Sequence, residues 1–296
     1  MTTYSLKIAD YTIFFNGMTP GISLRPSASQ QSFITDSSHF DLALNVFTGP
    51  VVVREEATAV FRAPYVEEID GRMVKKSDEF WTVYRLGDYI LVRTSCPISP
   101  SCNEALLVIR PGEKSWDLIM DSSSTVVDPM CYPVDGLILY YLTALKGDIF
   151  IHGSGVSHKD RGYLFTGRSG RGKTTIAGLF NDSGSQVVHD DRLVIRQKDK
   201  GVFMYNTPVY DNEKYNEASL SSIYIIDHGK KNESRPLSRS DAVSSIMSNC
   251  IQHHWDSGLI NNLTGSIVQL IDRVKVKKLK FVPDSTLVSF IEEDEH

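Results

Sequence analysis

One stretch of the chain, Gly167-Arg168-Ser169-Gly170-Arg171-Gly172-Lys173-Thr174-Thr175, combines residue types that can hold a phosphate group. It matches the pattern G-x-x-x-x-G-K-[ST]. In this pattern, glycines let successive backbone N–H groups face a phosphate, and the lysine and the N-terminus of the following helix attract its negative charge. The stretch therefore predicts a binding site for a nucleotide, such as ATP or a related nucleoside triphosphate.

The residues on either side of this loop have the order that the pattern requires. Tyr163 to Thr166 is a short apolar run that predicts a strand entering the loop, and Thr174 to Phe180 has apolar residues at helical spacing. A strand, a glycine loop and a helix are thus expected in succession. The alternative is a glycine-rich turn between unrelated elements.

Two adjacent carboxylates, Asp190 and Asp191, end a second predicted strand that starts at Gln186. A nucleotide-bound Mg²⁺ needs the Thr174 hydroxyl and a carboxylate that arrives on a strand beside the loop. Because neighbouring strand residues point to opposite faces, and a strand end relaxes this rule, one aspartate can serve the metal while the other accepts a proton from an attacking hydroxyl. The alternatives are a surface turn or a helix cap. His189 is interpreted as a neutral strand residue, with a catalytic role as the alternative.

The elements that position these residues are expected in the second of two domains. Residues 1–130 form a β-rich domain without a catalytic motif, because short apolar runs there alternate with turn-forming residues. These runs are Tyr11 to Phe15, Leu42 to Phe47, Val51 to Val53, Trp81 to Leu86, Tyr89 to Val92, Ala105 to Ile109 and Trp116 to Met120, with a hairpin turn at Arg85 to Tyr89. A helix from Pro133 to Lys146 is expected to mark the boundary, and residues 131–296 form an α/β domain.

Further elements follow the same patterns in this second domain. Strands are predicted at Asp148 to Gly153 and at Ile223 to Ile226, and helices from Pro236 to about Cys250 and from Trp255 to Asp272. The lysines that alternate through Val274 to Phe281 indicate an edge strand with one wet face, or alternatively a basic groove. The acidic tail, residues 291–296, is expected to be solvated.

Composition limits the class of protein. The 296 residues are 41% hydrophobic and 23% charged, with a formal net charge of −5, which is ordinary for a soluble protein and argues against broad binding to nucleic acid or to an anionic membrane. The first residues lack the features of a secretory signal, and no apolar run is long enough to span a bilayer, so a cytoplasmic location is expected.

The cysteine pattern predicts no metal site. Cys96, Cys102, Cys131 and Cys250 contain no C-x-x-C pair and show no ordered spacing with histidine. Neither a zinc site nor a disulfide scaffold is indicated, and the four residues are interpreted as reduced thiols.

Three motifs in order resemble the catalytic domain of the HPr kinase/phosphorylase family, which is structurally akin to phosphoenolpyruvate carboxykinase. They are Ile151-His152-Gly153 with Gly155-Val156, the run from Leu164 to Thr175, and Val187-Val188-His189-Asp190-Asp191-Arg192. The resemblance spans roughly residues 133–291. It implies an HPr-kinase-like P-loop fold and a kinase that depends on Mg²⁺ and a nucleotide and acts on a serine hydroxyl or on another alcohol.

The resemblance also assigns roles to residues. Gly167 to Thr175 would hold the phosphates, with Lys173 on the β- and γ-oxygens and Thr174 on the metal ion. Asp190 would be the general base and Asp191 the metal partner, and His152 would lie close to the reacting phosphoryl group. Phosphoryl transfer depends mainly on positioning and charge neutralisation, so a metal ion, a lysine and a base can suffice.

The chain departs from the true HPr kinase/phosphorylases after the aspartates. Their glycine-rich signature is replaced by the segment from Met204 to Tyr215, and the N-terminal half does not align with theirs. The pattern is more similar to family members in peptide natural-product pathways, such as kinases that modify the C-terminal residue of lasso-peptide precursors. The expected partner is a peptide or small protein with an acceptor hydroxyl. The alternatives are a small-molecule alcohol as acceptor, or a regulatory nucleotide-binding module without turnover. The sequence does not decide the oligomeric state, and a homo-oligomer is one alternative.

Overall fold

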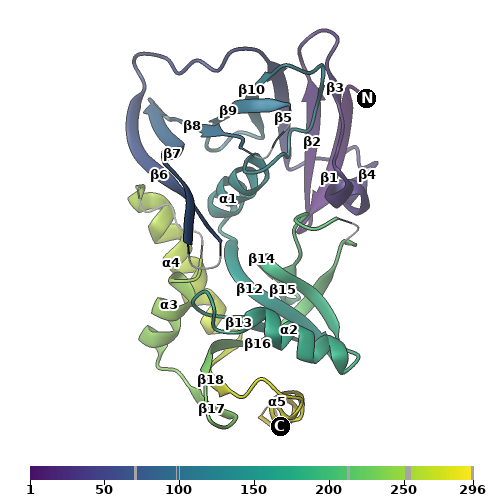
Figure 1. The fold of residues 1–296 in the computed structure, drawn as a ribbon, viewed down its shortest axis with the longest axis vertical. Coiled ribbons are helices and arrows are strands. Elements are labelled where there is room, and N and C mark those ends of the chain that lie inside the picture. Colours follow the sequence, from purple (N-terminus) through teal and green to yellow (C-terminus); the bar gives the residue numbers. More distant parts are fainter. Residues whose placement is uncertain (70–71, 98, 100, 212–213, 251–254, 295–296) are drawn as a thin grey trace. The chain divides into compact units, whose positions relative to one another are not determined.

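A computed structural model describes residues 1–69, 72–97, 99, 101–211, 214–250 and 255–294 (Figure 1). The chain divides into two compact units. The first is Met1–Tyr141 with a short segment that begins at Tyr210, and the second is Leu142–Val209 with Lys214–His296. This division lies within helix α1 (Val134–Lys146). The domain boundary predicted at residues 130 and 131 stays a prediction.

The first unit is built on a nine-stranded sheet in the order β4-β1-β2-β5-β10-β9-β8-β7-β6. Alternate residues of its central strands are buried, for example Leu42, Leu44 and Val46, as expected for a sheet with one face on a core. The strands are β1 (Thr3–Ile8), β2 (Tyr11–Gly17), β4 (Ile34–Thr35), β5 (Leu42–Thr48), β6 (Thr58–Ile69), β7 (Arg72–Leu86), β8 (Tyr89–Ser95), β9 (Cys102–Ile109) and β10 (Ser115–Ser122); β3 (Ser23–Leu24) pairs with β11 (Val126–Val127), and η1 is Ala28–Phe33.

The second unit contains a seven-stranded sheet in the order β13-β12-β14-β15-β16-β18-β17. Because β13 also pairs with β16, the five strands from β13 to β16 form a closed circuit. The strands are β12 (Ile149–His158), β13 (Arg161–Thr166), β14 (Gln186–Lys198), β15 (Gly201–Tyr205), β16 (Glu217–His228), β17 (Glu233–Pro236) and β18 (Lys275–Phe281), and the helices are α2 (Lys173–Asp182), α3 (Arg239–Met247), α4 (Ser257–Ile271) and α5 (Thr286–Asp294).

Strand β16 separates two hydrophobic clusters in this unit. Ile223 and Ile225 belong to a cluster that includes residues of α3 and α4, whereas Tyr224 and Ile226 belong to one that includes residues of α2 and α5. Figure 1 shows these two helix pairs on different sides of the strands. A strand buried on both faces needs an unbroken apolar run, which explains the sequence Ile-Tyr-Ile-Ile.

Three expectations from the sequence are wrong. Val51 to Val53 is not a strand. Strand β18 is not an edge strand, since it pairs with β16 on one side and β17 on the other. Its lysines form ion pairs, such as Lys277 with Asp294 and Lys280 with Glu233. The C-terminal residues 291–294 belong to α5, where Ile291 is buried because it continues the apolar stripe of that helix. No helix of the described residues is long and apolar enough to cross a membrane.

Candidate phosphate-binding and phosphotransfer site

The loop from Gly167 to Gly172 joins the end of β13 to the start of α2, as the sequence pattern predicts. Gly170 and Gly172 have φ values of 74° and 90°, a left-handed conformation that glycine adopts at little cost. Gly172 is the N-cap of α2 and provides no side-chain hydrogen bond to the first turn, which also contains no acidic residue. The amides at this helix end thus lack a capping side chain, the condition under which a helix N-terminus binds anions.

Close packing holds the loop in this conformation. A Cβ atom on Gly172 would lie 2.8 Å from Cζ of the buried Phe281, and one on Gly167 would lie 3.1 Å from the Ile226 carbonyl oxygen. The Thr166 hydroxyl, at the last residue before the loop, donates a hydrogen bond to the carbonyl oxygen of His152 on β12 (2.7 Å). The loop is therefore fastened both to the core and to the neighbouring strand.

Lys173, the first residue of α2, extends its side chain back over the loop. Its ammonium group donates hydrogen bonds to the carbonyl oxygens of Gly167 (3.0 Å) and Arg168 (3.3 Å), and the residue is only 8% exposed. Burial lowers the pKa of Lys173, and the negative charges of Asp190 and Asp191 oppose this shift. Thr174 and Thr175 follow in the first helical turn and are exposed.

The two aspartates lie on β14, which is separated from the loop strand β13 by β12. In this register, Gly153 of β12 pairs with Thr166 on one side and with Asp191 on the other. Two strand spacings put the backbones of Thr166 and Asp191 about 10 Å apart. The adjacent Ser154 pairs with Asp190 and donates its hydroxyl to Oδ1 of that residue. The carboxylates and the phosphate loop thus meet across one strand of the sheet.

Asp191 contacts the imidazole of His152 and the guanidinium of Arg192. His152 Nδ1 lies 3.2 Å from Oδ1, and Arg192 Nε lies 3.2 Å from Oδ2. Burial raises the pKa of Asp191, but the hydrogen bond from His152 and the charge of Arg192 outweigh this effect and hold the pKa below its usual range. Asp191 is accordingly ionised at neutral pH, as a metal ligand must be.

The residues at the site suit Mg²⁺ bound together with a phosphate better than a cation whose ligands all come from the protein. Mg²⁺ is usually bound by one or two carboxylates together with substrate phosphates and water, and Asp191 with the Thr174 hydroxyl offers that incomplete set. In the described part of the chain, His152, Asp190 and Asp191 do not form a compact group of metal ligands. A divalent cation here would need the oxygens of a bound phosphate.

A cavity of ≈ 450 Å³ adjoins the loop on the side of α3. Its lining includes Gly167, Arg168, Ser244 and Asn249, and the Asn249 carbonyl oxygen accepts a hydrogen bond from the backbone amide of His152 (3.0 Å). The cavity therefore lies next to the strand that also contacts the carboxylates. Its charged groups are Arg168, Arg171, Lys278 and Asp227, the last of which lies 3.0 Å from Arg171.

The structure thus brings several predicted site residues into one region, namely the loop, Lys173, His152, Asp190 and Asp191, while their functional roles stay predictions. His189 points elsewhere, since it is buried with its ring 3.5 Å from the Thr207 hydroxyl. Sequence reasoning missed Ser154 as the partner of Asp190. Only the pairing of β12 with β14 could have identified it, and no local pattern encodes that register.

Comparisons with known proteins add a weak likeness. No protein-family model matches the sequence, and no curated protein matches it. A solved structure that resembles this chain is the Hpr(Ser) kinase/phosphatase from Coxiella burnetii, with a TM-score of 0.29 and 13% sequence identity over 49% of this chain and 97% of that chain. The function is therefore inferred from the geometry of the site.

Proposed function

We propose that this protein is a phosphotransferase that uses Mg²⁺ and ATP, or a related nucleoside triphosphate, to phosphorylate a hydroxyl group. The observation that carries the proposal is the meeting of a glycine loop, an uncapped helix N-terminus and two aspartates across strand β12. A phosphate loop alone would serve a nucleotide sensor equally well. The second aspartate favours an enzyme, because a sensor does not need a base beside its metal ligand.

The loop binds the donor nucleotide in this proposal. Backbone amides of Gly170, Gly172 and the first turn of α2 surround the phosphates, and Lys173 exchanges its hydrogen bonds to the loop carbonyls for bonds to phosphate oxygens. Thr174 and Asp191 would hold the metal ion, which would neutralise charge on the phosphates. The His152 and Arg192 side chains keep the Asp191 carboxylate oriented and ionised.

Asp190 acts as the general base. The acceptor oxygen forms a bond to the γ-phosphorus while its proton passes to the Asp190 carboxylate, and the bond from that phosphorus to the β–γ bridging oxygen breaks to release a nucleoside diphosphate. The Ser154 hydroxyl donates a hydrogen bond to Oδ1 of Asp190 and so helps to orient this carboxylate. Phosphoryl transfer requires the reacting groups to be held close together. In this proposal the base, the loop and the metal ligand meet across strand β12 and satisfy that requirement.

The acceptor in this proposal is a serine hydroxyl of a peptide or small protein, such as the precursor of a ribosomal natural product of the lasso-peptide type. The motif resemblance supports this choice over a small-molecule alcohol. The cavity between Gly167 and Asn249 offers room for the acceptor group beside His152. Its exposed lining residue Ser244 allows an extended chain to continue into solvent.

Mass spectrometry of reactions with Mg²⁺, ATP and a panel of acceptors tests the proposal. The panel contains peptides and small proteins encoded beside the gene, with HPr as a comparison. We expect a gain of about one phosphate mass on an acceptor hydroxyl. Asp190→Asn should abolish it while nucleotide binding by calorimetry is retained, and Asp182→Asn, at the exposed far end of α2, should leave transfer unchanged.

Three outcomes would contradict the proposal at different levels. Nucleotide binding without transfer to any acceptor in the panel would favour the regulatory module or a small-molecule acceptor. Full turnover by Asp190→Asn would remove that residue from the role of base. Absence of nucleotide binding would contradict the phosphate loop itself.

A further inference from the structure

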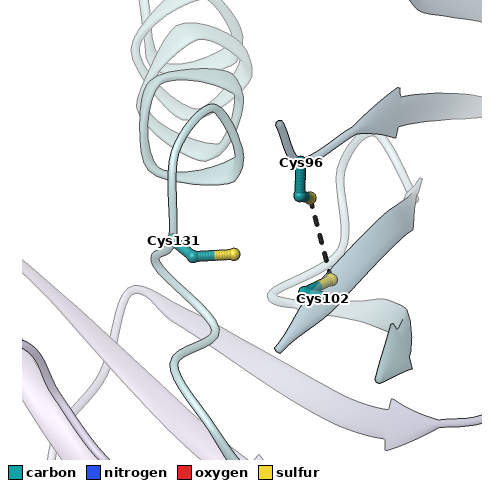
Figure 2. A group of neighbouring side chains, drawn as sticks. All are labelled: Cys96, Cys102 and Cys131. Atoms are coloured by element: carbon teal, nitrogen blue, oxygen red, sulfur yellow. Dashed lines mark hydrogen bonds between the residues drawn. The ribbon is translucent and has the colours of Figure 1, made fainter. Parts of the chain in front are cut away.

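Three of the four cysteines converge in the first unit, although their spacing along the sequence contains no metal-binding pattern. Cys96, Cys102 and Cys131 have sulfur atoms that all lie within 4.8 Å of one another (Figure 2). Cys96 and Cys102 are 3% and 2% exposed, and Cys131 is partly exposed. In the described part of the chain, this is the only compact group of three potential metal-ligating side chains.

Two separate segments bring the sulfur atoms together. Cys96 follows strand β8 and Cys102 begins strand β9, and the Cys96 amide donates to the Asn103 carbonyl oxygen (2.8 Å), so the two cysteines close the same hairpin. The Ser99 hydroxyl accepts a hydrogen bond from the Cys102 amide (3.2 Å). Cys131 comes from the turn before α1, and its side chain points at the other two in Figure 2.

The spacing of the sulfur atoms fits a metal better than a disulfide. The Cys96 and Cys102 sulfurs are 3.7 Å apart. Four ligands around a tetrahedral zinc ion with Zn–S bonds of about 2.3 Å have sulfur atoms about 3.8 Å apart. A disulfide would require about 2.05 Å and would leave the third sulfur without a role. Three sulfur atoms within 4.8 Å of one another can share one metal ion.

We propose that Cys96, Cys102 and Cys131 bind one thiophilic cation, Zn²⁺, as three thiolates. The fourth position is taken by an oxygen ligand on the side of the partly exposed Cys131, either water or the Ser99 hydroxyl, which hydrogen-bonds that cysteine. Binding replaces the thiol protons, which are released to solvent, by bonds from sulfur to the metal ion. The site lies within Met1–Tyr141 and is independent of the proposed phosphotransfer.

The surroundings favour a divalent over a monovalent cation. Three thiolates with Zn²⁺ leave one negative charge, whereas three thiolates with Cu⁺ leave two. The carboxylate of Asp121 repels negative charge on Cys102, and the carboxylate of Asp128 repels negative charge on Cys131. Because nearby carboxylates raise the energy of excess negative charge, the complex with the smaller residual charge is more stable.

The site would fasten the β8–β9 hairpin to the turn that starts α1. The Cys131 carbonyl oxygen accepts a hydrogen bond from the amide of Val134, the first residue of the helix. A metal ion bound to Cys131 therefore fixes the position at which α1 begins. Metal binding at this site stabilises the folded state, since the unfolded chain does not present the three sulfurs together.

Elemental analysis of the protein purified without chelator or affinity metal tests the site. We expect about one zinc per chain, bound with loss of reactivity at three thiols. Cys131→Ser should lose the zinc, whereas Cys250→Ser, which removes a buried cysteine outside the cluster, should retain it. Removal of zinc by a chelator should lower the Tm of the wild type and of Cys250→Ser but not of Cys131→Ser.

A second measurement on the wild type keeps the proposal open to refutation if Cys131→Ser does not fold. Bound zinc should protect all three cysteines from thiol alkylation, as detected by mass spectrometry. After chelation, all three should become reactive together. A Cys96–Cys102 disulfide, copper in place of zinc, or reduced thiols that take up no added Zn²⁺ would each overturn the assignment.

Discussion

Three glycines in and after the phosphate loop lead to a graded prediction for alanine substitution. Gly170 has a φ of +74° and no atom within 4 Å of an added Cβ, so Gly170→Ala introduces backbone strain alone, about 1–2 kcal/mol. Gly172 has a φ of +90°, and its added Cβ would lie 2.8 Å from Cζ of Phe281. Gly178 lies inside α2 with open space around it and without a positive φ.

The expected order follows from these geometries. Phe281 is fully buried in the cluster beneath α2, so it cannot move without disturbing the core, and overpacking adds about 1–3 kcal/mol to the strain at Gly172. Gly172→Ala should therefore lower the free energy of unfolding by about 2–5 kcal/mol. Gly178→Ala should raise it by about 0.5–1 kcal/mol, because alanine restricts the unfolded helix segment more than glycine does.

Urea denaturation of the three variants measures this order, with calorimetric titration of Mg²⁺·ATP alongside. Gly178→Ala serves as the control for the titration, because its position is away from the loop. Gly172→Ala should weaken nucleotide binding under conditions in which the variant is folded. Equal destabilisation by Gly170→Ala and Gly172→Ala would refute the contact with Phe281. A Phe281→Leu background should relieve the cost at Gly172 specifically, and additive effects of the two changes would refute it as well.

Three further predictions test the site and the electrostatics. Lys173→Met should weaken ATP binding roughly 10- to 150-fold through loss of charge-assisted hydrogen bonds of about 1.5–3 kcal/mol, measured by calorimetry, whereas the exposed Lys280→Met should not change it. Ser244→Phe fills part of the cavity beside the loop and should lower transfer on the order of 100-fold with unchanged ATP affinity, and normal transfer would exclude the cavity as the acceptor site. Burial raises the pKa of Asp128 to about 6, so its favourable contribution to stability, complete below about pH 4, is lost as the pH rises through 6. Between pH 4 and pH 8, the wild type should therefore lose about 1–3 kcal/mol more stability than Asp128→Asn in denaturant titrations, and equal pH dependence of the two proteins would contradict the burial effect.

Local features of the fold could be predicted from the sequence. The turn from Arg85 to Tyr89 joins two antiparallel strands, and its Gly87 has a φ of +57°. The loop from Gly167 and the helix that follows it also form as predicted, because glycine positions and helical spacing act over a few residues. Each of these elements is decided by its own sequence, so a local pattern is sufficient.

Features that depend on distant pairing could not be predicted. The lysine pattern of β18 indicates an edge strand, yet β17 covers it, and nothing within β18 encodes that partner. The cysteines gave no signal because Cys96 and Cys102 are close only after the hairpin forms, and Cys131 joins them only through the approach to α1. A spacing rule such as C-x-x-C detects ligands on one turn and misses ligands gathered by the sheet.

Strand β12 explains why the candidate site depends on both local and distant features. In three consecutive residues, the His152 side chain contacts Asp191, Gly153 pairs with Asp191 and Thr166, and the Ser154 hydroxyl bonds Asp190. A Cβ atom on Gly153 would lie 2.9 Å from the Leu164 side chain and 3.0 Å from a backbone oxygen of β13. Because only glycine lets β13 approach so closely, this strand sets the distance between the loop and the carboxylates. The loop sequence can thus indicate a phosphate, but the base and the metal ligand come within reach of it through the strand between them.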